Sequence, residues 1–359
     1  MTNNNIRPVL MVPLRRCGSH ALRLRLNLSP EFYAPYPLHI VDFINFLPLY
    51  GGLDEPSQYF QLIVDLVGLQ NASMVKWKNV VLDPVLLFER VRDRVPNIHT
   101  VLWEMLYTAA EQRQAQVVMD KSLDSVFYAE ELIQVNPDML FLNVVRDPRA
   151  QISSMNKAII YDFNTLLNTQ RWVKAYRKAR EIEQKYPERT LTIRFEDFVV
   201  HQEEVLRRIC DFIGISFIPD MIKISQSKEA TEISRLSNLW KNNGFDPIAS
   251  NINKFTRSLS SHEIILIETL TEELMDYYGY ERMTTGTVHM TPKLYEQARQ
   301  ENSLKTQRAW VTLAQKNHID YTLRRFRTDY LAMIQQRLEA PPAMETQDEP
   351  FESSILAVS

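Results

Sequence analysis

The feature that most constrains this chain is an alternation between short apolar runs and longer segments with helical spacing. Four runs rich in Val, Leu, Ile and Met have the length of buried strands. They occupy residues 6–14, 116–119, 139–145 and 190–195. Segments with helical spacing lie between them, for example residues 165–186 and residues 84–114, where Pro96 interrupts the helix. Because strands that alternate with helices form parallel sheets, the sequence predicts an α/β fold.

Composition limits the classes of protein to which the chain can belong. Hydrophobic residues make up 45% and charged residues 24% of 359 residues, as in an ordinary globular protein with a sizeable core. With 41 Lys plus Arg against 44 Asp plus Glu, the net charge is −3. No global field therefore attracts nucleic acid or an anionic membrane, and any anion site must be local.

Targeting features and cysteine usage point to an intracellular protein. No apolar run approaches the roughly 20 residues that cross a bilayer, so we expect no transmembrane segment. The first residues, MTNNN, lack the features of a secretory signal, and we expect a cytoplasmic location. Cys17 and Cys210 are the only cysteines, which excludes a disulfide framework and a multi-cysteine zinc site.

A first candidate anion site follows the first predicted strand. Residues 13–20, PLRRCGSH, place a glycine and a hydroxyl where a helix should begin. Free N–H groups and the helix dipole form a cradle for a phosphate-like anion there, and Arg16 adds a charged fork. The segment lacks the glycine and lysine spacing of a Walker loop. An ordinary surface turn with two arginines is an equally good explanation.

A second candidate anion site follows the strand at residues 139–145. Arg146, Asp147 and Pro148 come directly after it, and Ser154 lies eight residues beyond Arg146. Open α/β sheets bind ligands at the carboxyl ends of their strands, so two such sites suit a nucleotide with separated phosphates. The alternative is that Asp147 and Pro148 only begin a helix while Arg146 pairs with a nearby carboxylate.

Taken in order, these segments resemble sulfotransferases that use 3′-phosphoadenosine 5′-phosphosulfate (PAPS). Residues 16–20, RCGSH, resemble the family's 5′-phosphosulfate loop, commonly RSGST, with Cys17 and His20 as replacements. Residues 146–148 with Ser154 resemble its 3′-phosphate motif. Further similarities lie at residues 120–122 (DKS), 194–198 (RFEDF), 206–214 and 253–280. The resemblance therefore covers roughly residues 6–282.

The resemblance implies a P-loop-like parallel sheet flanked by helices, the sulfotransferase fold, for a catalytic domain at residues 1–282. It implies PAPS as cofactor, adenosine 3′,5′-bisphosphate as product, no metal, and a small-molecule alcohol as acceptor. The cofactor-binding residues that it implies are Arg16, Cys17, Gly18, Ser19, His20, Arg146 and Ser154. It also implies a helix directly after the loop, where leucines at residues 22–28 alternate with polar residues as in a strand. His20 lacks the hydroxyl of the usual Thr.

Transfer to an alcohol needs a group that accepts the hydroxyl proton and charges that stabilise the departing phosphate. Related sulfotransferases carry a Glu or His for the first task, some 20 to 30 residues beyond the loop. That window is residues 33–42, and we predict His39 as the base, with Asp42 as the alternative. Arg16 and Lys121 complete the predicted catalytic set. A structural His in this proline-rich loop is the competing explanation.

Residues 283–359 lie outside the resemblance and are predicted to form a helical C-terminal extension. Thr291 and Asp320 are expected as N-caps of two helices within residues 291–339, and the acidic end is expected to be loose. We expect the helices to dock on the catalytic domain or on a second copy, as a homo-oligomer. A basic cluster, Arg324, Arg325 and Arg327, forms either a solvated face or a site for an anionic partner.

Three functions remain open at this point. The first is a PAPS-dependent sulfotransferase, the second a P-loop-like kinase, and the third a non-catalytic nucleotide-binding protein that acts through its helical extension. Aromatic and aliphatic side chains in residues 33–59 and 157–171 favour a small lipophilic or polyketide-like alcohol over a polyanionic glycan as acceptor.

Overall fold

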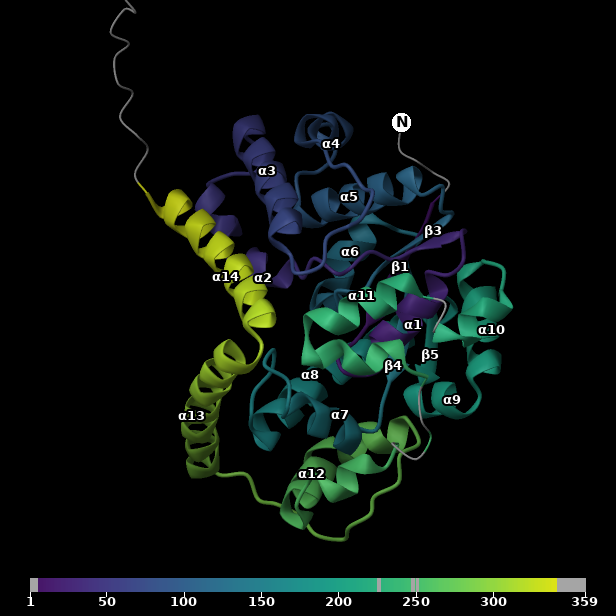
Figure 1. Cartoon of the computed structure of the whole chain (residues 1–359), viewed down its shortest axis with the longest axis vertical. Coiled ribbons are helices and arrows are strands. Elements are labelled where there is room, and N and C mark those ends of the chain that lie inside the picture. Colours follow the sequence, from purple (N-terminus) through teal and green to yellow (C-terminus); the bar gives the residue numbers. More distant parts are fainter. Residues whose placement is uncertain (1–5, 225–226, 247–248, 250–251, 341–359) are drawn as a thin grey trace, which may run out of the picture.

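The computed structural model describes residues 6–224, 227–246, 249 and 252–340. A five-stranded parallel sheet with the strand order β2-β3-β1-β4-β5 forms the centre of the molecule (Figure 1). Its strands are β1 (Arg7–Val12), β2 (Phe32–Tyr33), β3 (Val117–Asp120), β4 (Leu140–Val145) and β5 (Thr190–Arg194). Four of them confirm the apolar runs of the sequence. Strand β2 was missed because two residues at a sheet edge carry no periodic pattern.

Helices cover both faces of the sheet. Side chains alternate along β1, so Val9 and Met11 pack into one hydrophobic core while Leu10 and Val12 pack into another. The smaller core is covered by α1 (Ser19–Leu26), α9 (Phe195–Val200) and α10 (Gln202–Ile213). The larger core is covered by α3 (Pro56–Ala72), α4 (Pro84–Val91), α5 (Ile98–Gln112), α6 (Ala129–Val135), α7 (Pro148–Met155), α8 (Thr165–Lys185) and α12 (Ser261–Tyr277).

Shorter helices complete the fold at its edges. They are α2 (Val41–Ile44), α11 (Lys228–Leu236) and the 3₁₀ turns η1 (Leu47–Tyr50), η2 (Leu123–Tyr128), η3 (Pro187–Arg189), η4 (Pro219–Ile222), η6 (Asn238–Gly244) and η8 (Lys254–Arg257). The break predicted at Pro96 is confirmed. Asn97 caps α5 by accepting a hydrogen bond from the His99 N–H at 2.7 Å.

The alternating leucines after the first strand form helix α1, as the resemblance implies. The strand-like alternation arises because α1 is buried on more than one side, with Leu22 and Leu26 in one core and Leu24 in another. The intervening Arg23 and Arg25 are buried as well, and they pair with Glu229 at 2.5 Å and Asp246 at 2.9 Å. A helix that is buried all round loses the periodicity on which a sequence prediction depends.

The C-terminal extension contains two long helices, α13 (Pro292–Lys316) and α14 (His318–Glu339). The Thr291 side chain caps α13 as predicted. The prediction of Asp320 as the second N-cap was wrong, because Asn317 caps α14 by accepting from the Asp320 N–H. Asp320 is buried and accepts hydrogen bonds from Ser237 and Arg324. The predicted loose acidic end lies outside the described residues.

Both helices of the extension dock on the rest of this chain. Helix α14 packs against α3, where the Tyr330 hydroxyl donates to the Asp65 carbonyl at 3.1 Å and Arg337 pairs with the Asp65 carboxylate. A Cβ at Gly68 would lie 1.9 Å from the Tyr330 hydroxyl, so only glycine permits this contact. Helix α13 packs along α8. Association with a second copy stays a prediction.

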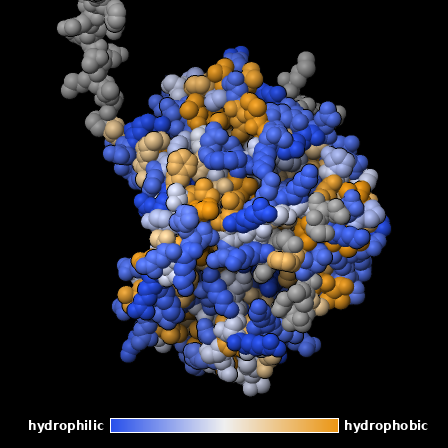
Figure 2. All heavy atoms as spheres, viewed as in Figure 1, coloured by the Kyte–Doolittle hydropathy of each residue, from blue (hydrophilic) through white to orange (hydrophobic). Residues whose placement is uncertain are grey.

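One face of the molecule shows how polar and apolar side chains are distributed over the surface. The view in Figure 2 is mainly hydrophilic, with hydrophobic side chains in separate patches. No helix in the described part of the chain has both the length and the apolar character that a membrane span requires.

A substitution at Gly68 tests the docking of α14. We expect Gly68→Val to displace Tyr330 and cost roughly 1 to 3 kcal/mol through overpacking, with faster proteolysis of residues 283–340. Limited proteolysis and chemical denaturation measure both effects. Adding Tyr330→Ala should restore much of the protection because it removes the clash. If Gly68→Val alone is as resistant as the wild type, the contact does not hold α14 in place.

Candidate functional site

The turn from β1 into α1 is held in an unusual backbone conformation. Arg16 and Gly18 have positive φ angles of 76° and 97°. A Cβ at Gly18 would lie 2.1 Å from the Phe195 ring, so a glycine is required there. Strained backbone of this kind is concentrated at functional sites, and His39, with φ 54°, is another such residue.

A neutral side chain from α7 supports the same turn. The Gln151 amide, fully buried, donates to the carbonyls of Leu14 and Arg15 at 3.3 and 3.0 Å. Its oxygen accepts hydrogen bonds from Trp172 and Tyr176 of α8. Hydrogen bonds from a neutral amide therefore help to fix the loop. Nothing in the sequence pattern singled out Gln151, because its role depends on contacts across the fold.

Three cations form a cluster at the carboxyl ends of β1, β3 and β4: Arg16, Lys121 and Arg146. Within the described residues, none of them makes an ion pair with a carboxylate. Arg16 donates to the Ser154 hydroxyl at 3.1 Å, and Arg146 donates to the Arg16 carbonyl at 2.8 Å. The Arg146 Nε is buried without a hydrogen-bond partner. Cations in such a setting leave charge available for an anionic ligand.

Electrostatics within the cluster are unfavourable for the protein alone. Burial lowers the pKa of Arg146, and burial together with the Arg146 charge lowers the pKa of Arg16. The Arg146 guanidinium lies over the Phe195 ring, 4.7 Å from its centroid, which offsets part of this cost. Phe195 thus contacts both Gly18 and Arg146, the two halves of the predicted anion site.

Lys121 follows β3 and is only 1% exposed. Burial, reinforced by the charges of Arg23 and Arg15, lowers the pKa of Lys121 to about 7. The next residue, Ser122, accepts a hydrogen bond from the His39 N–H at 3.3 Å. Residues 120–122 (DKS) therefore connect two parts of the site. Lys121 belongs to the cation cluster, and Ser122 binds the loop that carries the predicted base, His39.

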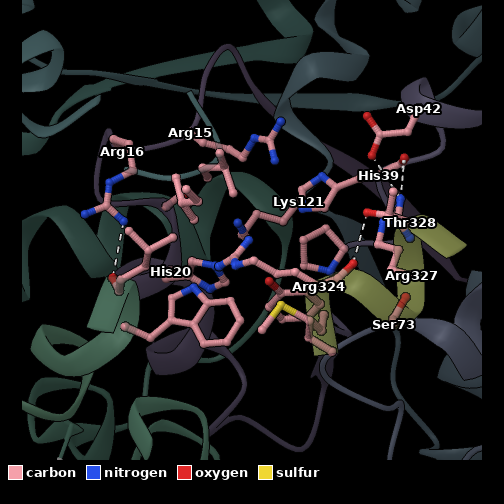
Figure 3. A pocket seen from close by; sticks show the side chains of 18 of the residues that line it. Arg15, Arg16, His20, His39, Asp42, Ser73, Lys121, Arg324, Arg327 and Thr328 are labelled. Carbon is pink, nitrogen blue, oxygen red and sulfur yellow. Dashed lines mark hydrogen bonds and ion pairs between the residues drawn. The ribbon is translucent and has the colours of Figure 1, made fainter. Parts of the chain in front are cut away.

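A pocket of about 280 Å³ opens beside this cluster (Figure 3). Arg16, Ser19, His20 and Lys121 form one wall, and His39 lies close to Lys121 in the pocket lining. Arg146 and Ser154 do not line the pocket, although Arg16 contacts both. Two predicted anion motifs that are distant in sequence are therefore adjacent in the structure.

The remaining predicted cofactor residues differ in their surroundings. The Cys17 side chain packs into the smaller hydrophobic core, where burial raises the pKa of its thiol, and it does not line the pocket. His20 lines the pocket and stacks on Tyr36 at a ring distance of 5.7 Å. Burial and neighbouring cations lower the pKa of His20 well below its ordinary value, so its ring is neutral at pH 7.

The two predicted bases, His39 and Asp42, differ in burial and in their partners. Burial, together with the charges of Arg15, Lys121 and Arg327, lowers the pKa of His39 well below its ordinary value of 6.5. The ring is therefore neutral at pH 7, and its Nδ1 is buried without a partner. The Asp42 carboxylate is instead 52% exposed and pairs with Arg327 at 3.0 Å. A neutral imidazole can accept a proton directly, whereas Asp42 would first lose its partner.

Part of the pocket comes from regions that the sequence analysis did not assign to it. Arg324, Arg327 and Thr328 of α14 line it, as does Trp310 of α13. Leu239 and Trp240 of η6 also line it, and the Trp240 ring packs edge-on against Tyr36. In the sequence, only the basic cluster of Arg324, Arg325 and Arg327 indicated that the extension could bind a ligand. Arg324 and Arg327 line the pocket, whereas Arg325 pairs with Asp329 on the surface.

Comparison with known proteins identifies the family. The profile of the sulfotransferase family matches residues 8–219. The chain belongs to the sulfotransferase family. A search of curated proteins found no match.

Two solved structures show the same fold. The sulfotransferase domain of the Synechococcus PCC 7002 olefin synthase aligns with a TM-score of 0.53 and 20% identity, over 78% of this chain and 98% of that domain. The sulfotransferase domain from the curacin biosynthetic pathway aligns with a TM-score of 0.54 and 21% identity, over 77% and 98%. The resemblance stated from the sequence is therefore confirmed for family and fold.

The cost of burying Lys121 gives a test of the cation cluster. We expect Lys121→Met to stabilise the protein, because it removes a buried cation that has no carboxylate partner. The folded pKa, about 7, lies below the unfolded value of 10.5, so the gain is greatest below pH 7. It should shrink by about 1.4 kcal/mol per pH unit as the pH rises from 7 towards 10.5.

Urea denaturation at pH 6 and pH 9 measures this change. The exposed Lys174 provides the control, since Lys174→Met should have an effect near zero that does not vary with pH. A Lys121→Met variant that is less stable than the wild type at pH 6 would show that Lys121 has a stabilising partner.

Proposed function

We propose that this sulfotransferase uses PAPS as donor and transfers the sulfuryl group to the hydroxyl of a small-molecule alcohol. The observation that carries the proposal is the cation cluster of Arg16, Lys121 and Arg146. It lies beside the glycine turn, and no carboxylate in the described part of the chain is within ion-pair distance of it. A bisphosphate with separated anionic groups matches this distribution of charge.

The residues present fit such a donor. We assign Arg146 and Ser154 to the 3′-phosphate, because the unpartnered Nε of Arg146 needs an acceptor. We assign Arg16, with the N–H groups of residues 18–20, to the 5′ side, where the first turn of α1 offers free donors. The absence of a Cβ at Gly18 lets the chain pass close to Phe195 and keeps these N–H groups at the start of the helix.

The proposed chemistry divides between the walls of the pocket. When bound, PAPS supplies the sulfuryl group, whose bond to the 5′-phosphate oxygen breaks as the bond to the acceptor oxygen forms. His39 accepts the hydroxyl proton as that bond forms. Arg16 stabilises the negative charge that develops on the departing phosphate, and Lys121 does so in its protonated form, which a nearby anion favours. The low pKa of His39 keeps its imidazole unprotonated at pH 7, and it also makes the ring a weaker proton acceptor than a free imidazole.

The acceptor is proposed to be a small lipophilic or polyketide-like alcohol. The pocket walls include Ile159, Ile160 and Trp240, and a volume of about 280 Å³ suits a compact molecule. The names of the two structural neighbours, an olefin synthase and a curacin pathway, agree with acceptors of this kind.

Donor specificity is tested by thermal shift. Adenosine 3′,5′-bisphosphate at 100 times its dissociation constant should stabilise the protein by about 2.7 kcal/mol, and ATP with magnesium should stabilise it far less. Arg146→Ala should weaken bisphosphate binding about 10- to 150-fold, the equivalent of a charge-assisted contact of roughly 1.5 to 3 kcal/mol. Equal stabilisation by ATP that depends on magnesium would instead favour a kinase.

The role of His39 is tested by turnover with a working acceptor. We expect His39→Ala to lower kcat by about 10²- to 10⁴-fold while bisphosphate binding stays nearly unchanged. Since the folded pKa of His39 is well below 6.5, the acid limb of the wild-type kcat profile should lie below pH 6.5 and vanish in the variant.

Asp42→Asn is the matched comparison, because Asp42 shares the loop and the pocket. It should retain most of the turnover. If Asp42→Asn is inactive and His39→Ala is nearly normal, the base is the carboxylate and the assignment of His39 is wrong.

A further inference from the structure

We propose that α14 forms an anion-binding subsite for the acceptor, in which Arg324 binds a carboxylate or a similar anionic group of the hydroxyl compound. This inference rests on the proposed function and narrows the acceptor class to hydroxy acids. The subsite consists of Arg324, Arg327 and Thr328 of α14 with Trp310 of α13, all of which line the pocket. In Figure 3, Arg324 and Arg327 enter the pocket from the α14 side.

Arg324 is fixed in place and incompletely partnered. Its Nε donates to the Asp320 carboxylate at 2.7 Å, and Asp320, 2% exposed, also accepts from the Ser237 hydroxyl at 2.6 Å. The Arg324 side chain is 12% exposed, and its Nη2 is buried without a hydrogen-bond partner among the described residues. A guanidinium that is fixed through its Nε and has an unpartnered Nη2 beside it is preorganised for an anion that enters the pocket.

Arg327 connects this subsite to the proposed base. Its Nη2 donates to the His39 carbonyl at 3.2 Å and to the Asp42 carboxylate at 3.0 Å. Arg327 is therefore a positioning residue, because it holds the His39 loop against α14. An acceptor whose anionic end is bound at Arg324, one helical turn from Arg327, has its other end available to His39.

The balance of charge in the pocket favours an anionic acceptor. The lining contains five Arg or Lys side chains and one carboxylate, Asp42. Arg15 pairs with Asp124 and Arg327 pairs with Asp42, while Arg16 and Lys121 are assigned to the donor. Arg324, whose partner Asp320 binds only its Nε, is therefore the cation left for the remaining space. Ile159 and Trp310 provide apolar contacts in the same pocket. The expected acceptor thus combines a hydroxyl, a compact apolar body and an anionic group.

A matched pair of probes tests the inference on the full chain loaded with adenosine 3′,5′-bisphosphate. The probes are 4-(hydroxymethyl)benzoate and 4-(hydroxymethyl)benzamide, which have the same shape but differ in charge. Trp240 and Trp310 line the pocket, so tryptophan fluorescence reports binding. We expect the wild type to bind the carboxylate at least tenfold more tightly than the amide, and Arg324→Gln to lose this preference.

The control is Arg325→Gln, the same substitution one residue away on the surface of α14, which should keep the preference. The affinity for adenosine 3′,5′-bisphosphate shows whether the anion that binds Arg324 belongs to the acceptor or to the donor. An unchanged affinity in Arg324→Gln supports an acceptor anion, whereas a loss means that Arg324 serves the donor and overturns the inference.

If Arg324→Gln fails to fold, two measurements on the wild type still test the acceptor subsite and the proposed function. Equal affinity for the two probes in the bisphosphate-loaded protein overturns the acceptor subsite and leaves the proposed function intact. Failure of the wild type to bind bisphosphate overturns the proposed function, together with the inference that rests on it.

Discussion

The contact on which the site depends is that of the Phe195 ring with two other parts of the chain. Phe195 follows β5, yet its ring touches Gly18 at the end of β1 and lies under the Arg146 guanidinium at the end of β4. Because β1, β4 and β5 are neighbours in the sheet, one aromatic side chain can contact both the turn at Gly18 and the Arg146 guanidinium, and so fix their relative positions. A displacement of this ring would therefore move both proposed halves of the donor site together.

Neutral and charged groups together hold the site, since Arg146 and Arg327 donate to the carbonyls of Arg16 and His39. The cations of the cluster nevertheless make no ion pair with a carboxylate of the described residues. The Gln151 amide fixes the turn through backbone carbonyls, and Ser122 fixes the His39 loop through its hydroxyl. Elsewhere the fold does satisfy its buried arginines with carboxylates, as Arg149 does with Asp147 and Glu268. This difference supports the proposal that the cation cluster binds an anionic ligand, because unpaired buried cations do not stabilise a fold.

Short-range patterns in the sequence predicted most of the fold and the wall of the pocket that carries the cation cluster. Apolar runs gave four strands, and the motifs around Arg16, Lys121 and Arg146 converge because parallel strands end at the same edge of a sheet. The other wall of the pocket was not predictable in this way. The hydrogen bond from Arg327 to the His39 carbonyl joins residues 288 positions apart, and no periodicity in either segment reports such a contact. The placement of Asp320 failed for a related reason, since its partner Ser237 is also distant.

The position of α14 has a consequence for the order in which the protein is completed during synthesis. The five strands, the turn and the Phe195 ring are all present once the first 200 or so residues have left the ribosome, as synthesis proceeds from the amino terminus. Arg324 and Arg327 emerge more than a hundred residues later. A nascent chain can thus assemble the cation cluster while the opposite wall of its pocket is still missing. Any selectivity that α14 gives the pocket therefore arises after the cation cluster has been synthesised.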